Sequence, residues 1–246
     1  MIALVQTTAV ILAGGAGTRL RSVVADRPKV LAQLGGKPFI AYLLDRLATQ
    51  GWQKVVLCTG YMGAQVQETL GDQYQGMQLS YSHEEQPLGT GGAIRQALPL
   101  ITSATVLILN GDSYCDTDLR ASLAWHQDRE ARVTVVMAHV EQGSRYGRVE
   151  IGADGQIRRF VEKNPDLTGG GWINSGVYWF EREVLAGLPA GRAFSLEKEV
   201  LGTWTGDGLY GYRDYGRFLD IGVPEDHARA ENFLAEVHEP IVNVAR

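Results

Sequence analysis

The sequence predicts an α/β fold in which a mainly parallel sheet is flanked by helices and is followed by a small β-rich annex. In the first half, short apolar runs rich in β-branched residues alternate with longer segments of helical period. After Val140, closely spaced strand-like runs are separated by turn residues such as Asp154-Gly155. Buried strands that alternate with helices are typical of a Rossmann-like sheet, with its ligand at the carboxyl ends of the strands.

The elements of the first half follow one another in a regular order. Apolar runs predict strands over residues 8–12, 54–59, 77–81 and 105–109. Helical periodicity predicts helices over residues 38–50, 62–70 and 91–98, and Asp116 and Asp118 are expected to start a further helix over 119–126. Three polar or small residues, Gly14, Asn110 and Asp112, come just past strand ends, where a ligand is expected.

The second half begins with closely spaced strands, predicted over residues 148–151, 157–162 and 172–180. A last helix is predicted over residues 224–237. It opens with Pro224 followed by two acidic residues, which suits the positive end of a helix dipole.

Composition and charge exclude several classes of protein. Of the 246 residues, 45% are hydrophobic and 21% charged, which is enough for one sizeable core. A net charge of -5 argues against non-specific binding to nucleic acid or to an anionic membrane. The isolated Cys58 and Cys115 suggest neither a metal site nor a disulfide, and no apolar stretch approaches the roughly 20 residues of a membrane helix. We expect a cytoplasmic monomer or homodimer without a nucleic-acid or membrane partner.

A glycine-rich turn follows the first strand, from Leu12 to Leu20. Its backbone N–H groups can approach phosphate oxygens without obstruction from Cβ atoms. A dinucleotide fingerprint would need a third glycine in place of Leu20, and a Walker loop would need Ser or Thr where Pro38 follows Gly36-Lys37. Because Arg19 and Arg27-Pro28-Lys29 add positive charge beside the turn, the segment predicts a triphosphate site.

These motifs resemble those of the sugar-phosphate nucleotidylyltransferase family. Gly14 to Leu20 and Pro28-Lys29 match its opening pattern. Further motifs follow in the family's order over roughly residues 7–235: Gln86-Pro87-Leu88-Gly89-Thr90-Gly91-Gly92-Ala93, Asn110-Gly111-Asp112, Glu162-Lys163, Asn174-Ser175-Gly176 and Asp220-Ile221-Gly222. The resemblance implies the nucleotide-diphospho-sugar transferase fold. It also implies Mg²⁺-dependent transfer of a nucleoside monophosphate from an NTP to a sugar 1-phosphate, with release of pyrophosphate.

Within the family, segments such as Phe194-Ser195-Leu196-Glu197-Lys198 are most similar to the D-glycero-D-manno-heptose 1-phosphate guanylyltransferases. GTP and D-glycero-α-D-manno-heptose 1-phosphate are therefore the expected substrates. Mannose 1-phosphate guanylyltransferases and N-acetylmuramate 1-phosphate uridylyltransferases share much of the framework and remain alternatives. A non-catalytic sugar-nucleotide-binding regulatory protein is an alternative of another class, because a fold does not fix a function. The complete set of charged residues argues against it.

The resemblance assigns the catalytic charges residue by residue. Arg19 would hold the β- and γ-phosphates through its planar fork, Lys29 would reach the α-phosphate, and Lys163 would bind the sugar 1-phosphate. Asp112 and Asp220 resemble the two Mg²⁺ carboxylates, and two suffice because substrate phosphates and water complete the coordination. The simpler interpretations are surface ion pairs for the cations and turn residues for the aspartates.

The remaining expected contacts fall into two groups. The nucleotide is expected to bind Leu12, Gly14, Gly15, Gly17, Thr18, Glu85, Gln86, Gly89, Thr90 and Asp112. The sugar is expected to bind Tyr146, Gly147, Glu162, Asn174 and Gly176. A carboxylate such as Glu85 can accept hydrogen bonds from N1–H and N2–H₂ of guanine, which favours GTP; a solvated loop acid is the simpler alternative.

We expect a single domain with a division of labour along residues 1–246. About 1–140 would bind the nucleotide, about 141–223 would bind the sugar and complete the metal site, and 224–246 would form the C-terminal helix and tail. The sequence departs from many relatives at Gly91-Gly92, where Ala-Gly is common, and in Val30-Leu31-Ala32-Gln33 after the lysine. Both segments border the nucleotide, so they leave the choice of base and sugar open.

Overall fold

A computed structural model describes residues 4–15, 17, 20, 26–141, 146–161, 169–204 and 208–238. Four residues with predicted roles, Thr18, Arg19, Glu162 and Lys163, lie outside the described residues. The described chain is a mixed sheet with helices on both faces, which confirms the predicted fold class. Among the described residues, no helix is long and apolar enough to cross a membrane.

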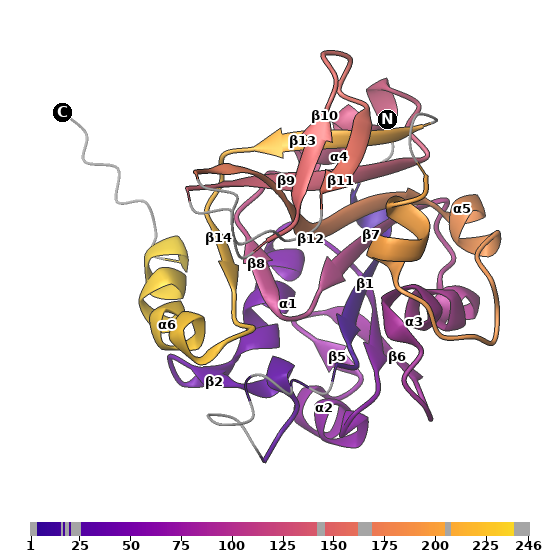
Figure 1. Ribbon diagram of the computed structural model, residues 1–246. Coiled ribbons are helices and arrows are strands. Elements are labelled where there is room, and N and C mark those ends of the chain that lie inside the picture. The colour runs from indigo at the N-terminus through magenta and orange to yellow at the C-terminus, as the bar shows by residue number, and fades with distance from the viewer. Residues whose placement is uncertain are drawn as a thin grey trace.

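The centre of a ten-stranded sheet is parallel (Figure 1). Strands β7 (Thr105–Asn110), β1 (Thr8–Ala13), β4 (Lys54–Thr59) and β6 (Met77–His83) lie side by side in that order. The two-residue β5 (Gln73–Tyr74) closes the edge in the antiparallel direction. Because the strands are parallel, the loops that follow β1, β4, β6 and β7 meet at one edge of the sheet.

Strand β12 (Gly171–Glu181) joins this central sheet to the annex. It pairs antiparallel with β7 and with β9 (Val133–Val140), and β9 pairs in turn with the parallel β13 (Leu209–Asp214). The antiparallel hairpin of β10 (Arg148–Ile151) and β11 (Ile157–Val161) attaches to the other end of β12. The annex is thus a continuation of the same sheet.

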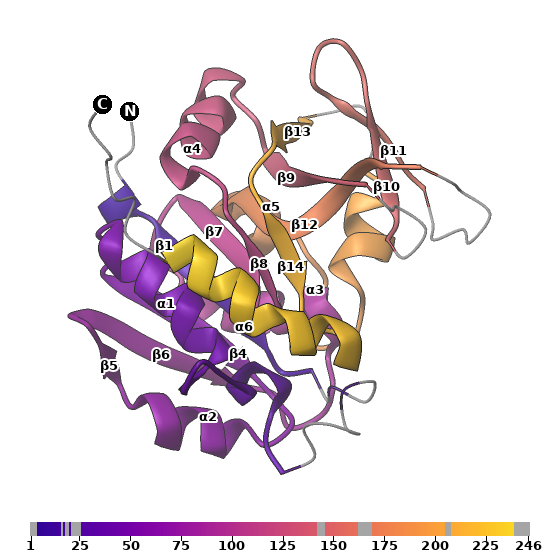
Figure 2. The same cartoon turned by 90° about the vertical axis from the view of Figure 1, so that its left-hand side faces the viewer.

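Helices cover both faces of the sheet because buried side chains alternate along its strands. On β1, Ala9 and Ile11 face one apolar core and Val10 faces the other. The first core is covered by α1 (Phe39–Thr49), α2 (Gly63–Leu70), α4 (Leu119–Asp128) and α6 (Pro224–His238). The second is covered by α3 (Gly89–Ala97), α5 (Arg182–Ala186) and the π-helix η4 (Leu196–Leu201). Figure 2 shows α6 running alongside α1, in front of the sheet.

Several short elements complete the described chain. The pair of β8 (Ser113–Cys115) and β14 (Phe218–Asp220) is antiparallel, as is the pair of β2 (Gln33–Leu34) and β3 (Lys37–Pro38). Three-residue 3₁₀ helices occur as η1 (Leu4–Gln6), η2 (Lys29–Leu31) and η3 (Leu98–Leu100). Of these elements, η2 and the β8–β14 pair carry charged residues to the edge where the parallel strands end.

Candidate active site

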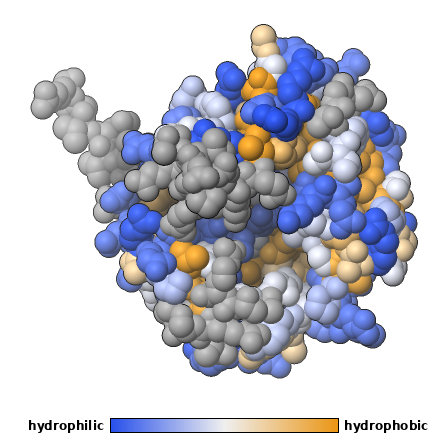
Figure 3. Space-filling view, in the orientation of Figure 1, coloured by the Kyte–Doolittle hydropathy of each residue, from blue (hydrophilic) through white to orange (hydrophobic). Residues whose placement is uncertain are grey.

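A cavity of about 680 Å³ opens at the carboxyl ends of β1, β4, β6 and β7. In Figure 3, which has the orientation of Figure 1, the surface is hollowed near its middle, and apolar residues are visible in the hollow. Of the predicted site residues, those that line the cavity are Leu12, Gly14, Gly15, Gly17, Lys29, Glu85, Gly89, Thr90 and Asp112. Those that are described but do not line it are Gln86, Tyr146, Gly147, Asn174, Gly176 and Asp220.

Lys29 stands between two aspartates at this cavity. Its Nζ atom lies 2.7 Å from Oδ2 of Asp112 and 3.9 Å from Oδ1 of Asp220. The lysine side chain is only 9% exposed, whereas those of Asp112 and Asp220 are 43% and 30% exposed. The structure therefore gathers three predicted charges, which are far apart in the sequence, into one cluster.

The β8–β14 pair brings the two aspartates together. Asp112 precedes β8 and Asp220 ends β14, and Ser113 pairs with Asp220. The backbone N–H of Ile221 donates to the carbonyl of Asp112 at 3.0 Å, and the N–H of Gly222 donates to Oδ1 of Asp220 at 2.6 Å. The first bond fixes the backbone of Asp112 against the ribbon, and the second orients the carboxylate of Asp220.

A tight turn directs Lys29 into the cluster. In η2, Val30 and Leu31 are buried in the core beneath the lysine. Gly17 lies against the lysine stem with φ +56°, and a Cβ atom there would come within 3.0 Å of the Lys29 Cβ. The glycine of the loop is therefore required both for its backbone conformation and for space beside Lys29.

The charges of the cluster suit a divalent cation. Two carboxylates lie beside the ammonium of Lys29, so oxygen ligands from two side chains converge at one point. Carboxylate oxygens are the hard ligands that Mg²⁺ prefers, and one or two of them are usual where a substrate's phosphates supply the rest. Within the described ranges, no group of three or more His, Cys, Asp or Glu residues is placed to hold a metal by itself.

Glu84 lies beneath the glycine loop and lines the cavity. Its Oε2 atom accepts from the N–H of Leu88 at 2.7 Å, and a Cβ atom on Gly14 would come within 2.7 Å of its Oε1. Burial raises the pKa of this carboxyl group, against smaller lowering effects of the Leu88 hydrogen bond and of His83. The carboxylate thus holds the loop after β6 and lies close against Gly14 of the loop after β1.

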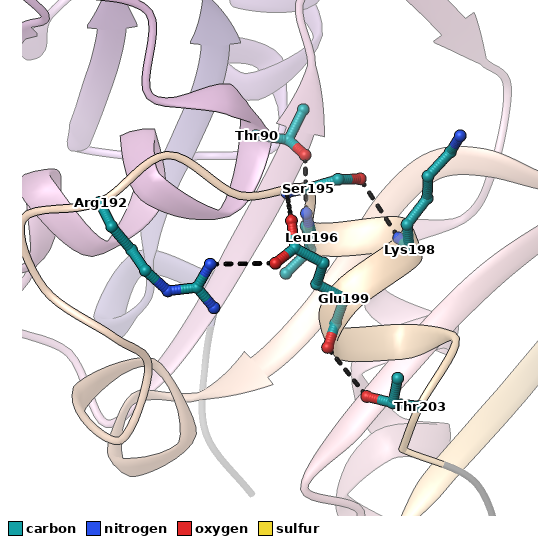
Figure 4. A network of polar contacts seen from close by, with 7 residues as sticks. All are labelled: Thr90, Arg192, Ser195, Leu196, Lys198, Glu199 and Thr203. Atoms are coloured by element: carbon teal, nitrogen blue, oxygen red, sulfur yellow. Dashed lines mark hydrogen bonds and ion pairs between the residues drawn. The ribbon is translucent and has the colours of Figure 1, made fainter.

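The first residues of α3 are held by the segment that enters η4. The hydroxyl of Thr90 donates to Oε2 of Glu197 at 2.7 Å. It also accepts from the N–H of Leu196 at 2.8 Å, as Figure 4 shows. The N–H of Gly91 donates to the carbonyl of Phe194 at 3.1 Å. A Cβ atom on Gly91 would lie 2.1 Å from the Phe194 ring, so this ring occupies the place that an alanine methyl would need.

A second network fixes the start of η4 itself. Ser195 caps the helix by accepting from the N–H of Lys198 at 3.2 Å, and its own N–H donates to Oε1 of Glu199 at 3.0 Å. Arg192 donates to the other oxygen of Glu199 at 3.0 Å. Figure 4 shows the amino group of Lys198 pointing away from these contacts.

Three described residues of the predicted sugar subsite, Tyr146, Asn174 and Gly176, have defined contacts outside the cavity lining. The rings of Tyr146 and Phe218 meet edge to face, 5.7 Å apart between their centroids. The carboxamide of Asn174 donates to the Tyr178 hydroxyl at 2.9 Å and accepts from the N–H of Gly176 at 3.0 Å. These two hydrogen bonds lie where the register of β12 shifts between Asn174 and Val177.

Sequence reasoning missed several residues of the cavity. Tyr61, His83 and Glu84 line it without having been assigned a role. Asn110 also lines it, as its place at the end of an apolar strand predicts, although no specific contact was assigned to it. Glu84 gave no separate signal in the sequence, because it adjoins Glu85, which also lines the cavity.

A comparison with protein families and curated proteins finds clear relatives. Residues 8–237 match the family described as nucleotidyl transferase. The chain is 37% identical over 227 residues to D-glycero-alpha-D-manno-heptose 1-phosphate guanylyltransferase of Aneurinibacillus thermoaerophilus, covering 92% of this chain and 97% of the relative. It is also 37% identical over 228 residues to mannose-1-phosphate guanylyltransferase of Mycobacterium tuberculosis, with 91% of this chain covered. This chain spans only 63% of the length of that second relative.

Solved structures agree with these matches. HddC from Yersinia pseudotuberculosis, complexed with GMP-PN, superposes with a TM-score of 0.83 at 33% identity, covering 92% of this chain and 99% of that one. A glucose-1-phosphate thymidylyltransferase from Bacillus anthracis superposes with a TM-score of 0.77 at 20% identity, which supports the fold alone.

Proposed function

The chain belongs to the nucleotidyl transferase family, and we propose that it transfers the guanylyl group of GTP to D-glycero-α-D-manno-heptose 1-phosphate. The observation that carries the proposal is the cluster of Lys29, Asp112 and Asp220 at a cavity large enough for a nucleotide. The heptose 1-phosphate guanylyltransferase that matches this chain nearly end to end supports the choice of substrates. The products are GDP-heptose and pyrophosphate.

The reaction needs no protein nucleophile. An oxygen of the sugar phosphate is already ionised at neutral pH and attacks the α-phosphorus of GTP. A P–O bond forms to the sugar phosphate while the bond from the α-phosphorus to the oxygen bridging it to the β-phosphorus breaks. The work left to the protein is to align the two anions and to stabilise the negative charge that moves to pyrophosphate.

The positive groups divide this work. Lys29 would meet the α-phosphate, a role that its low exposure and its position beside the aspartate pair support. Arg19 would hold the leaving pyrophosphate and Lys163 the sugar phosphate, as the family motifs imply. An ammonium in a water-poor site interacts more strongly with nearby charges than it does in bulk water. The low exposure of Lys29 therefore strengthens its electrostatic interactions.

Asp112 and Asp220 would hold Mg²⁺ in this proposal. The bound ion would supply a positive charge that polarises the phosphates. The position of Asp112 and Asp220 supports this role, because both carboxylates are partly exposed and lie at the same cluster beside Lys29. The hydrogen bond from Gly222 N–H orients Asp220 before any ion binds.

Guanine recognition is assigned to the loop between β6 and α3. Glu85 is exposed and lines the cavity, so its carboxylate can reach the N1–H and N2–H₂ edge of guanine. Adenine offers an acceptor at N1 and would be repelled there. Gln86, Gly89, Thr90 and the loop from Leu12 to Thr18 complete the proposed nucleotide contacts, and Tyr146, Gly147, Glu162, Asn174 and Gly176 the proposed sugar contacts.

We place the activity in the cytoplasm, where GTP is available and where the buried free thiols of Cys58 and Cys115 remain reduced. In this account residues 1–140 bind the nucleotide, and residues 141–223 bind the sugar and add Asp220.

Mannose 1-phosphate is the second candidate acceptor. The identity to the Mycobacterium tuberculosis enzyme equals that to the heptose enzyme, and the sugars share the manno configuration of their rings. The difference in coverage favours heptose, because the chain spans most of one relative and 63% of the other.

The test is pyrophosphate release with Mg²⁺ over a grid of four NTPs against four sugar 1-phosphates: D-glycero-α-D-manno-heptose, mannose, glucose and N-acetylmuramate. The proposal predicts strong release with GTP and the heptose phosphate. Faster release with mannose 1-phosphate or with UTP would replace the substrate and keep the reaction. If no pair of substrates releases pyrophosphate although the protein still binds GTP, a regulatory sugar-nucleotide-binding protein would be favoured.

A further inference from the structure

Glu197 receives hydrogen bonds from three hydroxyl groups. Its Oε2 atom accepts from Thr90 on α3 at 2.7 Å and from the cap residue Ser195 at 2.9 Å. Its Oε1 atom lies 3.5 Å from the hydroxyl of Tyr178 on β12, at the limit of a hydrogen bond. A half-buried carboxylate thus joins three hydroxyl groups that would otherwise need other partners.

One arm of this network ends at the proposed nucleotide subsite. Thr90 lines the cavity directly after Gly89, which has a left-handed φ of +67°. Because its hydroxyl is bonded to Glu197 and to the N–H of Leu196, the first turn of α3 has a fixed position. Loss of the carboxylate would leave this turn held only by its hydrogen bonds with Leu196 and Phe194, and so less firmly positioned beside the base.

The other arm ends at the proposed sugar subsite. Tyr178 is fully buried, and burial followed by the charge of Glu197 raises the pKa of its hydroxyl, which therefore stays protonated as a donor. The same hydroxyl accepts from the carboxamide of Asn174 at 2.9 Å. Asn174 in turn holds the N–H of Gly176 at the irregularity of β12.

We infer that Glu197 is a positioning residue that couples the nucleotide and sugar subsites, acting through Thr90 on one and through Tyr178 and Asn174 on the other. This inference rests on the proposed function. The carboxylate touches no substrate in this account; it sets the relative position of the two groups of side chains that do.

Glu199 offers a matched control in the same π-helix. It also accepts from the segment around Ser195 and pairs with Arg192, so it stabilises η4 as Glu197 does. Its side chain is 46% exposed, and neither Ser195 nor Arg192 belongs to a proposed subsite. Replacing Glu199 therefore measures the effect of destabilising η4 alone. Replacing Glu197 measures that effect together with the loss of coupling between the two subsites.

The experiment compares Glu197→Gln, Glu197→Ala, Glu199→Gln and Tyr178→Phe with wild type. Calorimetry gives the Kd of GTP without sugar phosphate, and then the Kd of the heptose phosphate on protein saturated with α,β-methylene-GTP, which cannot be cleaved. We expect Glu197→Ala to weaken both ligands by about tenfold, and Glu197→Gln by less, since hydrogen bonds to a charged group exceed those to a neutral one. Tyr178→Phe should weaken the sugar phosphate alone, and Glu199→Gln should change neither Kd.

Two outcomes would overturn the inference. If the Glu197 variants behave like Glu199→Gln, the carboxylate only stabilises η4. If Tyr178→Phe leaves the sugar phosphate Kd unchanged, the arm toward β12 positions nothing. If the wild-type protein binds GTP but turns over no sugar phosphate, the proposed function is wrong. The effect of the Glu197 variants on the Kd of GTP can still be measured in that case.

Discussion

At the scale of single residues, the proposed activity depends on which charges meet at the cavity. Asp112 and Asp220 come from different halves of the chain and meet only because β8 pairs with β14. Lys29 is held against both by its buried neighbours in η2. The residue types could be recognised from the sequence, whereas their convergence depends on two three-residue strands, which leave too short a pattern to detect.

Replacing Asp112 by Ala should abolish turnover and leave the fold intact, because the carboxylate is partly exposed and acts on the substrate's charge. Asp118→Ala is the matched control. Asp118 caps α4 by accepting from the N–H groups of Arg120 and Ala121, so its loss should cost about 1 kcal/mol of stability and no activity. Mg²⁺-dependent turnover of Asp112→Ala near the wild-type rate would remove the metal assignment.

Lys29→Met should lower kcat by about 100-fold or more, as expected when a charge that stabilises a transition state is removed. Steady-state kinetics with both substrates varied would measure it. An effect confined to the KM of the sugar phosphate would exchange the roles proposed for Lys29 and Lys163.

Glu84→Gln should make stability less dependent on pH. Burial raises the pKa of Glu84 in the folded protein above its ordinary value of 4.5. The folded state therefore holds the proton more tightly, so this group's stabilising contribution is full below the unfolded pKa and is lost as pH rises through the folded one. Denaturant unfolding should find the variant more stable than wild type at pH 7 and about equal near pH 4. Parallel stability curves at the two pH values would contradict this.

At the scale of elements, long apolar runs were predicted well and short or long-range pairings were not. The four predicted strands of the first half are confirmed as β1, β4, β6 and β7, with ends that differ by two residues at most. Helix α3 begins at Gly89, two residues before its predicted start, because contacts with Phe194 and Leu196 support the extra turn. Asp118, not Asp116, caps α4.

The annex shows which strand pairings cannot be predicted from local sequence patterns. Its strands over 148–151 and 172–180 are confirmed as β10 and β12, and β11 is confirmed as far as Val161, where the described segment ends. The sequence interpretation missed β9 and β13, which pair in parallel despite their separation in the chain. Pairing between distant strands is not encoded in local periodicity.

Gly176→Ala tests the irregularity of β12. This glycine has φ +77°, and a Cβ atom there would come within 2.6 Å of the Asn110 carboxamide. Gly191 is the control, because it has φ +70° and a Cβ atom added there would meet nothing within 4 Å. Both alanine variants should lose about 1 kcal/mol from backbone strain, and Gly176→Ala should lose roughly 1–3 kcal/mol more from the clash. Equal losses in denaturant unfolding would show that Asn110 moves away freely.

At the scale of the whole molecule, one sheet carries both proposed subsites. The family match over residues 8–237 confirms the resemblance found in the motifs. β12 pairs with β7, which ends beside Asp112, and also with the annex strands. A ligand that spans the cavity should therefore stabilise the entire described fold rather than one half of it.

Thermal unfolding tests this consequence. GTP at 100 times its Kd should stabilise the folded protein by about 2.7 kcal/mol, or roughly 5–10 °C in Tm for a chain of this size. The unfolding transition should stay single and shift as a whole, and ATP at the same concentration should shift it less. A split transition in which only one phase responds to GTP would show that the two halves unfold separately.

The most direct test of the central claim is ³¹P NMR of the wild-type protein with Mg²⁺, GTP and D-glycero-α-D-manno-heptose 1-phosphate. The account predicts that the α-, β- and γ-phosphate signals of GTP disappear together with that of the sugar phosphate. The signals of a nucleoside diphosphate sugar and of pyrophosphate, in equal amounts, should replace the substrate signals. Persistence of all substrate signals, or release of GDP and inorganic phosphate without a sugar nucleotide, would contradict guanylyl transfer.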